Sequence, residues 1–211
     1  MRIVFATGNA GKMREIRDIL ADIDAEVYSL KDMGLHSVAD ETGETFAANA
    51  LIKVREIYDI LKPSGDMKDT IIMADDSGLC IDAMGGAPGV HSARWMGHDT
   101  DYKIKNQAIL DEMKDVPEEK RGAGFVCHIS AIDEEGRVYD AEGEMRGRIA
   151  YESRGREGFG YDPIFYLPEM GMTSGELSEE EKNKISHRGK VLRMMKEILK
   201  GEGLIREREA E

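Results

Sequence analysis

The strongest constraint on the fold is the alternation along the chain between short apolar runs and segments whose apolar residues have helical spacing. Arg2–Ala6 is apolar and rich in β-branched residues, which predicts a short buried strand. Lys12–Leu20 places its apolar residues on one helix face, so we expect a helix directly after that strand. Because the alternation continues to the last helix, the sequence predicts an α/β protein.

The remaining elements follow the same rules. Strands are predicted at Glu26–Leu30, Thr70–Ala74, Leu79–Ala83, Ala123–Asp133 and Arg137–Ile149, and helices at Phe46–Leu61, Tyr102–Met113 and Glu179–Leu199. The turn Asp133–Gly136 joins two strands as a hairpin, which makes the sheet mixed. Residues 1–200 are predicted to form one domain followed by a charged tail, 201–211, of which Glu202–Glu211 is expected to fray.

Composition excludes several classes of function. The formal charge of −13 argues against a nucleic-acid scaffold, which needs a basic face. No apolar run is long enough for a signal peptide or a membrane span, so we expect a cytosolic protein. The cysteines, Cys80 and Cys127, lie in apolar runs and form no CxxC motif. With no HxxxH or HExxH motif either, a zinc site is not expected.

The turn from Thr7 to Lys12 is the first candidate site. A helix N-terminus presents backbone amides and a partial positive charge, and a lysine beside it suits a phosphate. Gly8 and Gly11, beside Asn9 and Ala10, let the backbone approach a ligand. A plain strand-to-helix connection uses the same residue types. The segment is not a P-loop, since Ala6 and Met13 stand where that motif needs Gly and Ser or Thr.

Carboxylates form the second candidate site. Asp75 and Asp76, followed by Ser77, end an apolar strand, and buried carboxylates are costly unless a cation uses them. Because strand side chains alternate, we expect one carboxylate at a metal and a water and the other in support. A solvated turn is the alternative. Glu41 is a candidate partner for Asp76. For Glu44, stabilisation of a helix N-terminus fits at least as well as a catalytic role.

Two further segments carry polar and aromatic residues together. Gly158–Pro163 offers Phe159, Gly160, Tyr161 and Asp162, which could stack on a base and bind it, although a strand entering a core has the same pattern. Lys182 and Ser186 share a helical face, and His187 and Arg188 follow. Taken singly, these residues also fit a solvated helix surface.

Together these segments form a pattern. TGNAGK, ETGETFAANA, ADDSGL, GGAPGVHSAR, GFGYDP and EEKNKISHRGK occur in the order and spacing of the inosine triphosphate pyrophosphatase family. The sequence resembles that family from Phe5 to about Leu192. The resemblance implies an elongated two-lobed α/β fold, with a long mixed sheet, flanking helices and a central substrate cleft. It also implies a homodimer that depends on magnesium and cleaves ITP, dITP or XTP to the monophosphate and pyrophosphate.

The resemblance also implies roles for individual residues. Glu41 and Asp76 would bind magnesium, Asp76 would orient or deprotonate the attacking water, and Asp75 would support it. The residues that would contact the triphosphate or frame the purine are Thr7, Gly8, Asn9, Ala10, Gly11, Lys12, Ser77, Phe159, Gly160, Tyr161, Asp162, Lys182, His187 and Arg188. Lys12 is also a candidate catalytic residue, and Phe159 would stack on the base.

Selectivity is expected to depend on the purine six-position. A buried donor facing the keto oxygen of inosine meets another donor in adenosine, a mismatch worth about 10⁴-fold in discrimination. A backbone amide, His187 or Arg188 could supply that donor. The sequence departs from the family pattern at His128 and over Met172–Leu177, which puts local packing in doubt rather than activity.

Two other functions remain open from the sequence. A nucleotide-binding regulator without turnover is one, although a pure anion binder gains nothing from Glu41 and Asp76 without a metal. A pyrophosphatase of the septum-inhibitor type, acting on modified pyrimidine nucleotides, is the other. The TGNAGK, GFGYDP and SHR blocks favour the purine family over it.

Overall fold

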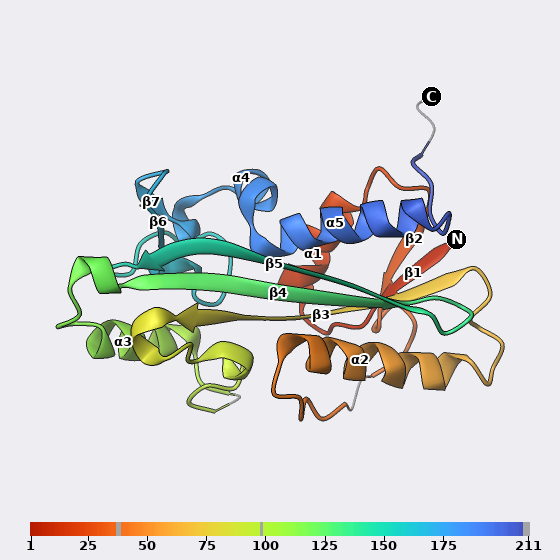
Figure 1. The fold of residues 1–211 in the computed structure, drawn as a ribbon, viewed down its shortest axis with the longest axis horizontal. Helices are drawn as coiled ribbons and strands as arrows, with labels where there is room; N and C mark the ends of the chain where they lie inside the picture. Colours follow the sequence, from red (N-terminus) through yellow and green to blue (C-terminus); the bar gives the residue numbers. More distant parts are fainter. Residues whose placement is uncertain (37–38, 98, 209–211) are drawn as a thin grey trace. The chain divides into compact units, whose positions relative to one another are not determined.

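The computed structural model describes residues 1–36, 39–97 and 99–208, which form a mixed sheet flanked by α-helices (Figure 1). The strands are β1 (Arg2–Phe5), β2 (Glu26–Ser29), β3 (Thr70–Ile81), β4 (Gly122–Ile132), β5 (Val138–Ile149), β6 (Phe165–Leu167) and β7 (Met172–Thr173). The helices are α1 (Ala10–Ile19), α2 (Phe46–Leu61), α3 (Tyr102–Glu112), α4 (Glu179–Ile185) and α5 (His187–Gly201).

The sheet has the strand order β2-β1-β3-β4-β5-β6-β7. β1 runs parallel to both β2 and β3, whereas β6 runs antiparallel to β5 and β7. The predicted α/β class with a mixed sheet is therefore confirmed. No helix within the described residues is long and apolar enough to cross a membrane.

Contacts divide the chain into two compact units. Unit 1 consists of Met1–Asp76, Cys127–Gly143 and Arg188–Glu211, of which residues 209–211 lie outside the described part. Unit 2 consists of Ser77–Val126 and Glu144–His187. The long strands β3, β4 and β5 each contribute residues to both units.

Unit 1 has helices on both faces of its strands. Ile3 and Phe5 of β1 pack in one core with residues of α1 and α5, whereas Val4 and Ala6 pack in another with residues of α2 (Figure 1). Both faces are therefore buried, which explains why the strand reads as a continuous apolar run rather than an alternating one. Successive residues of β3 are divided between the two faces in the same way.

Unit 2 has its own core. Residues of β3, β4, β5 and β6 pack there against Ile109, Leu110 and Met113 at the end of α3. Arg121 is almost completely buried and donates hydrogen bonds to the carbonyls of Met113, Ile149 and Ala150. Because each carbonyl lies at the end of an element, this one side chain ties the end of α3 to the end of β5.

Three predictions about elements are wrong. β3 does not end at Ala74, because it continues through Asp75 and Asp76, whose carboxylates have partners in the interior. The predicted helix Glu179–Leu199 is two helices, since Ser186 has extended backbone with ψ 151°. The tail does not fray over residues 202–208: Ile205 is buried, and Arg206 and Arg208 share backbone hydrogen bonds with the segment 22–24.

Candidate active site

The turn between β1 and α1 is exposed and preorganised. Gly8, Asn9 and Ala10 are all exposed to solvent. The Asn9 side chain accepts hydrogen bonds from the backbone amides of Gly11 (2.9 Å) and Lys12 (3.1 Å), and Thr7 Oγ1 accepts one from the Asn9 amide (3.2 Å). The turn is thus accessible, but Asn9 already caps the amides of Gly11 and Lys12, so these two donors are not open to a ligand unless the Asn9 oxygen moves.

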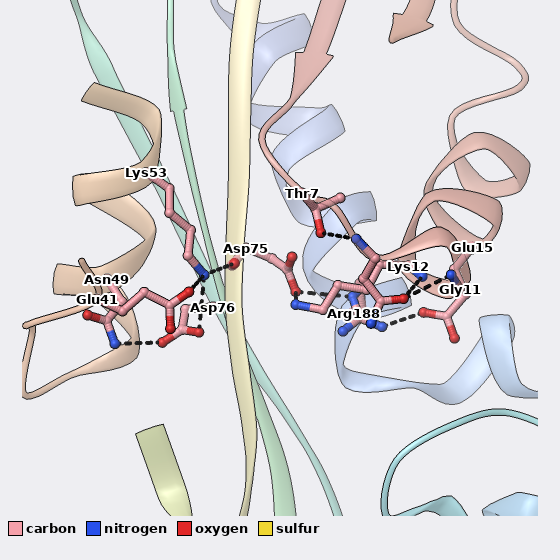
Figure 2. Close-up of polar contacts among 11 residues, drawn as sticks. Thr7, Gly11, Lys12, Glu15, Glu41, Asn49, Lys53, Asp75, Asp76 and Arg188 are labelled. Carbon is pink, nitrogen blue, oxygen red and sulfur yellow. Dashed lines mark hydrogen bonds and ion pairs between the residues drawn. The ribbon is translucent and has the colours of Figure 1, made fainter. Parts of the chain in front are cut away.

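Lys12 belongs to a buried network on one face of β3 (Figure 2). Asp75 Oδ2 accepts hydrogen bonds from Lys12 Nζ (2.8 Å) and from Arg188 Nε (3.2 Å). Arg188 also forms an ion pair with Glu15 of α1. The side chains of Asp75, Arg188 and Glu15 are less than a tenth exposed, so these charges stabilise one another away from water.

Asp76 points to the opposite face of β3, toward α2 (Figure 2). Its Oδ2 accepts a hydrogen bond from Asn49 Nδ2 (2.9 Å), and its Oδ1 lies 3.4 Å from Lys53 Nζ. Lys53 Nζ is also 2.7 Å from Glu41 Oε1. Glu41 and Asp76 therefore share one ammonium group, as expected for two carboxylates around a common cation.

The loop that carries Glu41 is held against α2. Gly43 donates its backbone amide to Asn49 Oδ1 (2.8 Å), and a Cβ at Gly43 would lie 2.7 Å from that oxygen. Thr45 caps the N-terminus of α2 by accepting a hydrogen bond from the Ala48 amide. Asn49 thus links the loop to Asp76 through the two ends of one amide, and glycine at position 43 permits the close approach.

The two aspartates have opposite pKa shifts although they are neighbours. Burial alone would raise the pKa of Asp75, but Lys12 and Arg188 outweigh it and hold that pKa well below its usual range. Burial raises the pKa of Asp76 above the ordinary value, and Lys53 and Asn49 only partly offset the effect. Asp75 is therefore a fixed negative charge, whereas Asp76 is the carboxylate better able to accept a proton.

The donor chemistry around Asp76 fits a hard cation. Glu41 and Asp76 present carboxylate oxygens, the ligands that magnesium prefers. Within the described residues, no three His, Cys, Asp or Glu side chains gather closely enough to hold a metal by themselves. A magnesium ion at this position would therefore complete its coordination with water and substrate oxygens, as magnesium sites with one or two carboxylates do.

In unit 2, the loop before β6 is anchored by a buried ion pair. Asp162 Oδ2 accepts hydrogen bonds from Lys182 Nζ (2.6 Å) and from the Phe159 amide (2.8 Å), and Asp162 Oδ1 accepts one from Ser174 Oγ (2.9 Å). Lys182 Nζ lies 4.5 Å from the centroid of the Phe159 ring. Phe159 is only half-buried while its anchors are buried, so its ring is a fixed but accessible surface.

Other residues predicted for the site have structural partners. Tyr161 is buried in the core of unit 2 and donates its hydroxyl to the Ser92 carbonyl (2.7 Å). His187 begins α5 and stacks on Phe125, with ring centroids 4.9 Å apart. Ser77 follows Asp76 in β3 and is half-buried, and Arg188 lies in the network of Asp75. None of these placements tests contact with a substrate, so their roles stay predictions.

Comparisons with known proteins show the family of this chain. Residues 3–198 match the model of the Ham1 family. The chain belongs to the Ham1 family. It is 43% identical over 200 residues to a protein of Clostridium perfringens named dITP/XTP pyrophosphatase, covering 95% of this chain and 98% of that protein. A Yersinia pseudotuberculosis protein of the same name is 43% identical over 203 residues, covering 94% of this chain and 98% of that protein.

Solved structures of Ham1 proteins have the same fold. The Staphylococcus aureus Ham1 protein superposes with a TM-score of 0.83 at 33% identity, covering 96% of this chain and all of that one. A HAM1 protein from Coxiella burnetii gives a TM-score of 0.82 at 36% identity, covering 95% of this chain and 99% of that one.

Several residues of this Ham1-family site were not predicted from the sequence. Asn49 lies in the first turn of α2 and Lys53 one turn later, and Glu15 lies one turn into α1. Lys53 and Asn49 are four residues apart, which places them on one helix face beside apolar neighbours. That spacing could have indicated a polar stripe inside a buried helix, but it could not have indicated Asp76 as the partner.

Proposed function

We propose that this chain is a pyrophosphatase that hydrolyses the non-standard purine triphosphates ITP, dITP and XTP to the monophosphate and pyrophosphate. The observation that carries the proposal is the pair Glu41 and Asp76, which share one cationic group across from the cationic turn at Lys12. Its presence in a Ham1-family chain, whose relatives are named dITP/XTP pyrophosphatases, connects that geometry to purine triphosphates. The activity removes deaminated purines from the nucleotide pool.

The triphosphate is bound at the start of α1. The exposed turn Thr7–Gly11 supplies backbone and hydroxyl donors near a helix N-terminus, where an anion is favoured. Lys12 supplies a positive charge, and Asp75 and Arg188 fix its position. Ser77 is a further substrate contact. Because the Asn9 oxygen caps the helix, the phosphate uses the remaining donors of the turn or displaces that oxygen.

Glu41 and Asp76 would hold the magnesium ion, which would supply positive charge to neutralise phosphate charge that would otherwise repel an attacking water. Lys53 belongs to the same group of charges, since its ammonium contacts both carboxylates. It keeps Glu41 and Asp76 together against their mutual repulsion. The carboxylate pair is thereby arranged before a substrate arrives, which lowers the cost of reorganisation.

Asp76 acts as the general base. A water oxygen forms a bond to phosphorus, the anhydride bond between the monophosphate and pyrophosphate parts breaks, and Asp76 takes the proton of the water. Burial raises the pKa of Asp76, and a base whose pKa is closer to the working pH is more effective. The hydrogen bond from Asn49 to Oδ2 fixes the direction of the carboxylate.

The purine stacks on Phe159. Asp162 holds the amide of Phe159, and Lys182 lies over its ring, so both the backbone and the ring of Phe159 are held in place. Gly160 and Tyr161 continue the loop, and His187 is a candidate donor to the keto oxygen of the base. Adenosine presents an amino group there, so a buried donor would be left facing a donor.

Pyrophosphate release from ITP, XTP, dITP, GTP, ATP and UTP, each with magnesium and with EDTA, tests the proposal. We expect fast release from the first three with magnesium and little from ATP or UTP. Equal rates on all purines would contradict the keto-selective site. A preference for UTP would favour the septum-inhibitor type, and no release from any nucleotide would favour a regulatory binder.

Assembly and location are proposals as well. The family resemblance supports a homodimer, which light scattering in solution would test. Cys80 and Cys127 are free thiols, which supports a reducing compartment such as the cytosol. Fractionation of cells expressing the protein would test that location.

A further inference from the structure

Asn106 holds the back of the loop that carries Phe159. It lies in α3 and donates its Nδ2 to the carbonyl of Gly160, at 3.1 Å. Gly160 directly follows Phe159, so this hydrogen bond fixes the Gly160–Tyr161 peptide on the C-terminal side of Phe159. The loop is therefore held at two points: at the Phe159 amide by Asp162, which pairs with Lys182, and at the Gly160 carbonyl by α3.

A second contact from α3 supports the same loop. The ring of Tyr102 meets the ring of Tyr161 edge to face, with centroids 5.2 Å apart. The Tyr161 hydroxyl donates to the Ser92 carbonyl, so this ring cannot shift without losing a buried hydrogen bond. A Cβ at Gly160 would lie 3.6 Å from Tyr102, which shows how closely the loop packs on the helix.

An asparagine at position 106 is energetically unfavourable. The residue is 5% exposed, and among the described residues its Oδ1 has no hydrogen-bond partner. A buried acceptor without a partner lowers the stability of the fold, so an apolar side chain would suit the interior of α3 better. The benefit of the side-chain amide is therefore the hydrogen bond that its Nδ2 donates to the Gly160 carbonyl.

We propose that Asn106 is a positioning residue for purine recognition, which acts through the Gly160 carbonyl to set the orientation of Phe159. The inference rests on the proposed function, in which Phe159 stacks on the base. Asn106 itself does not touch the substrate. Its loss leaves the phosphate and metal residues unchanged, but lets the loop take up orientations in which the ring no longer matches the base.

The variant Asn106→Leu tests the proposal, with Gln107→Leu as its matched control. Gln107 is the next residue of α3 and is exposed, and the amide that the control removes donates a hydrogen bond to Asp111 of the same helix. For Asn106→Leu we expect kcat/KM for ITP to fall about tenfold, equivalent to ~1.4 kcal/mol, mainly through a higher KM. We expect the ITP-to-ATP preference to fall by a similar factor, with the midpoint of thermal unfolding no lower than that of the control.

A purely structural role predicts a different result. Asn106→Leu would then unfold at a lower temperature and lose activity on ITP and ATP in equal proportion, or behave like the control, and either result would overturn the proposal. Should Asn106→Leu not fold, Asn106→Ala gives the same comparison with a smaller side chain. The variant Phe159→Ala distinguishes a failure of the proposed base site from a failure of the proposed role of Asn106. An unchanged preference in Phe159→Ala contradicts the base site itself, whereas a change in Phe159→Ala but not in Asn106→Leu contradicts only the role of Asn106.

Discussion

Two neighbouring aspartates show how strongly the surroundings of a single residue decide its chemistry. Asp75 and Asp76 follow one another in β3, so their side chains point to opposite faces of the sheet. One meets two cations and stays ionised, whereas the other meets an amide and a lysine shared with Glu41. The period of a strand was enough to predict two different roles, but not which aspartate has which.

Replacement of these residues by asparagine should separate the roles. Because the folded-state pKa of Asp76 is raised, its ionised form is a cost to stability at neutral pH, and Asp76→Asn should not lower the midpoint of thermal unfolding. Turnover should fall by about 10²-fold or more, since the base is lost. The folded-state pKa of Asp75 is lowered, so its ion pairs contribute stability at neutral pH that is lost as the pH falls through that pKa.

Asp75→Asn is therefore the matched control, and it should unfold at a lower temperature than the parent protein. Thermal unfolding followed by circular dichroism and pyrophosphate release measured on the same samples check both variants. Full turnover by Asp76→Asn would show that Asp76 is not the base. Equal destabilisation by the two variants would contradict the opposite pKa shifts.

At the scale of elements, the hairpin between β4 and β5 depends on one side chain. Asp133 Oδ1 accepts hydrogen bonds from the amides of Glu135 and Arg137, each at 2.9 Å. Its Oδ2 accepts from Arg137 Nε (2.8 Å) and from the Tyr139 hydroxyl (3.1 Å). Burial alone would raise the pKa of Asp133, but these hydrogen bonds outweigh it and lower that pKa.

Asp133→Asn should therefore cost about 1–3 kcal/mol of unfolding free energy at neutral pH, since two of the four donors lose their acceptor and the other two keep only an uncharged one. Because the pKa of Asp133 is lowered in the folded protein, its ionised side chain contributes its full stability above the pKa of an unfolded aspartate, about 3.9. That stability is lost as the pH falls through the pKa of Asp133 in the folded protein. The difference between parent and variant should thus shrink below about pH 4. Urea unfolding at several pH values measures it, with Glu135→Gln, an exposed partner of Arg137, as control. A difference independent of pH would show that the carboxylate charge is not responsible.

Elements were predicted well where a single pattern governed them. The spacing in Phe46–Leu61 gave the bounds of α2 directly, because Thr45 caps its start and the apolar face is continuous. The break between α4 and α5 was missed. Lys182 to Arg188 keeps helical composition, and only the extended backbone of the buried Ser186 separates the two helices.

At the scale of the whole molecule, the site depends on segments far apart in the chain. Lys12, Asp75 and Arg188 are separated by 63 and 113 residues, yet one carboxylate oxygen joins them. The net charge of −13 does not prevent a site for an anion, because Lys12, Lys53 and Arg188 gather around the two aspartates of β3. Binding of substrate and metal should therefore stabilise the fold that brings these residues together.

A non-hydrolysable ITP analogue with magnesium should raise the midpoint of thermal unfolding. At a ligand concentration of about 100 times Kd, the expected gain is ~2.7 kcal/mol of unfolding free energy. EDTA should remove most of the gain, because Glu41 and Asp76 would then repel the phosphates. Differential scanning fluorimetry gives the comparison, with the matching ATP analogue as control. A shift that EDTA leaves unchanged would contradict a metal at Glu41 and Asp76.

The sequence by itself determined the class of fold, most of its strands and helices, and the segments that carry the candidate site, because these depend on periodicity and on short motifs read locally. Only the tertiary structure decided which residues face one another. It continued β3 through two aspartates, buried Ile205 of the expected tail, and placed Lys53 and Asn106 at positions that no motif marks. The physical reason is that the cost of burying a charge or an amide is settled by partners from other elements, which a local pattern does not contain.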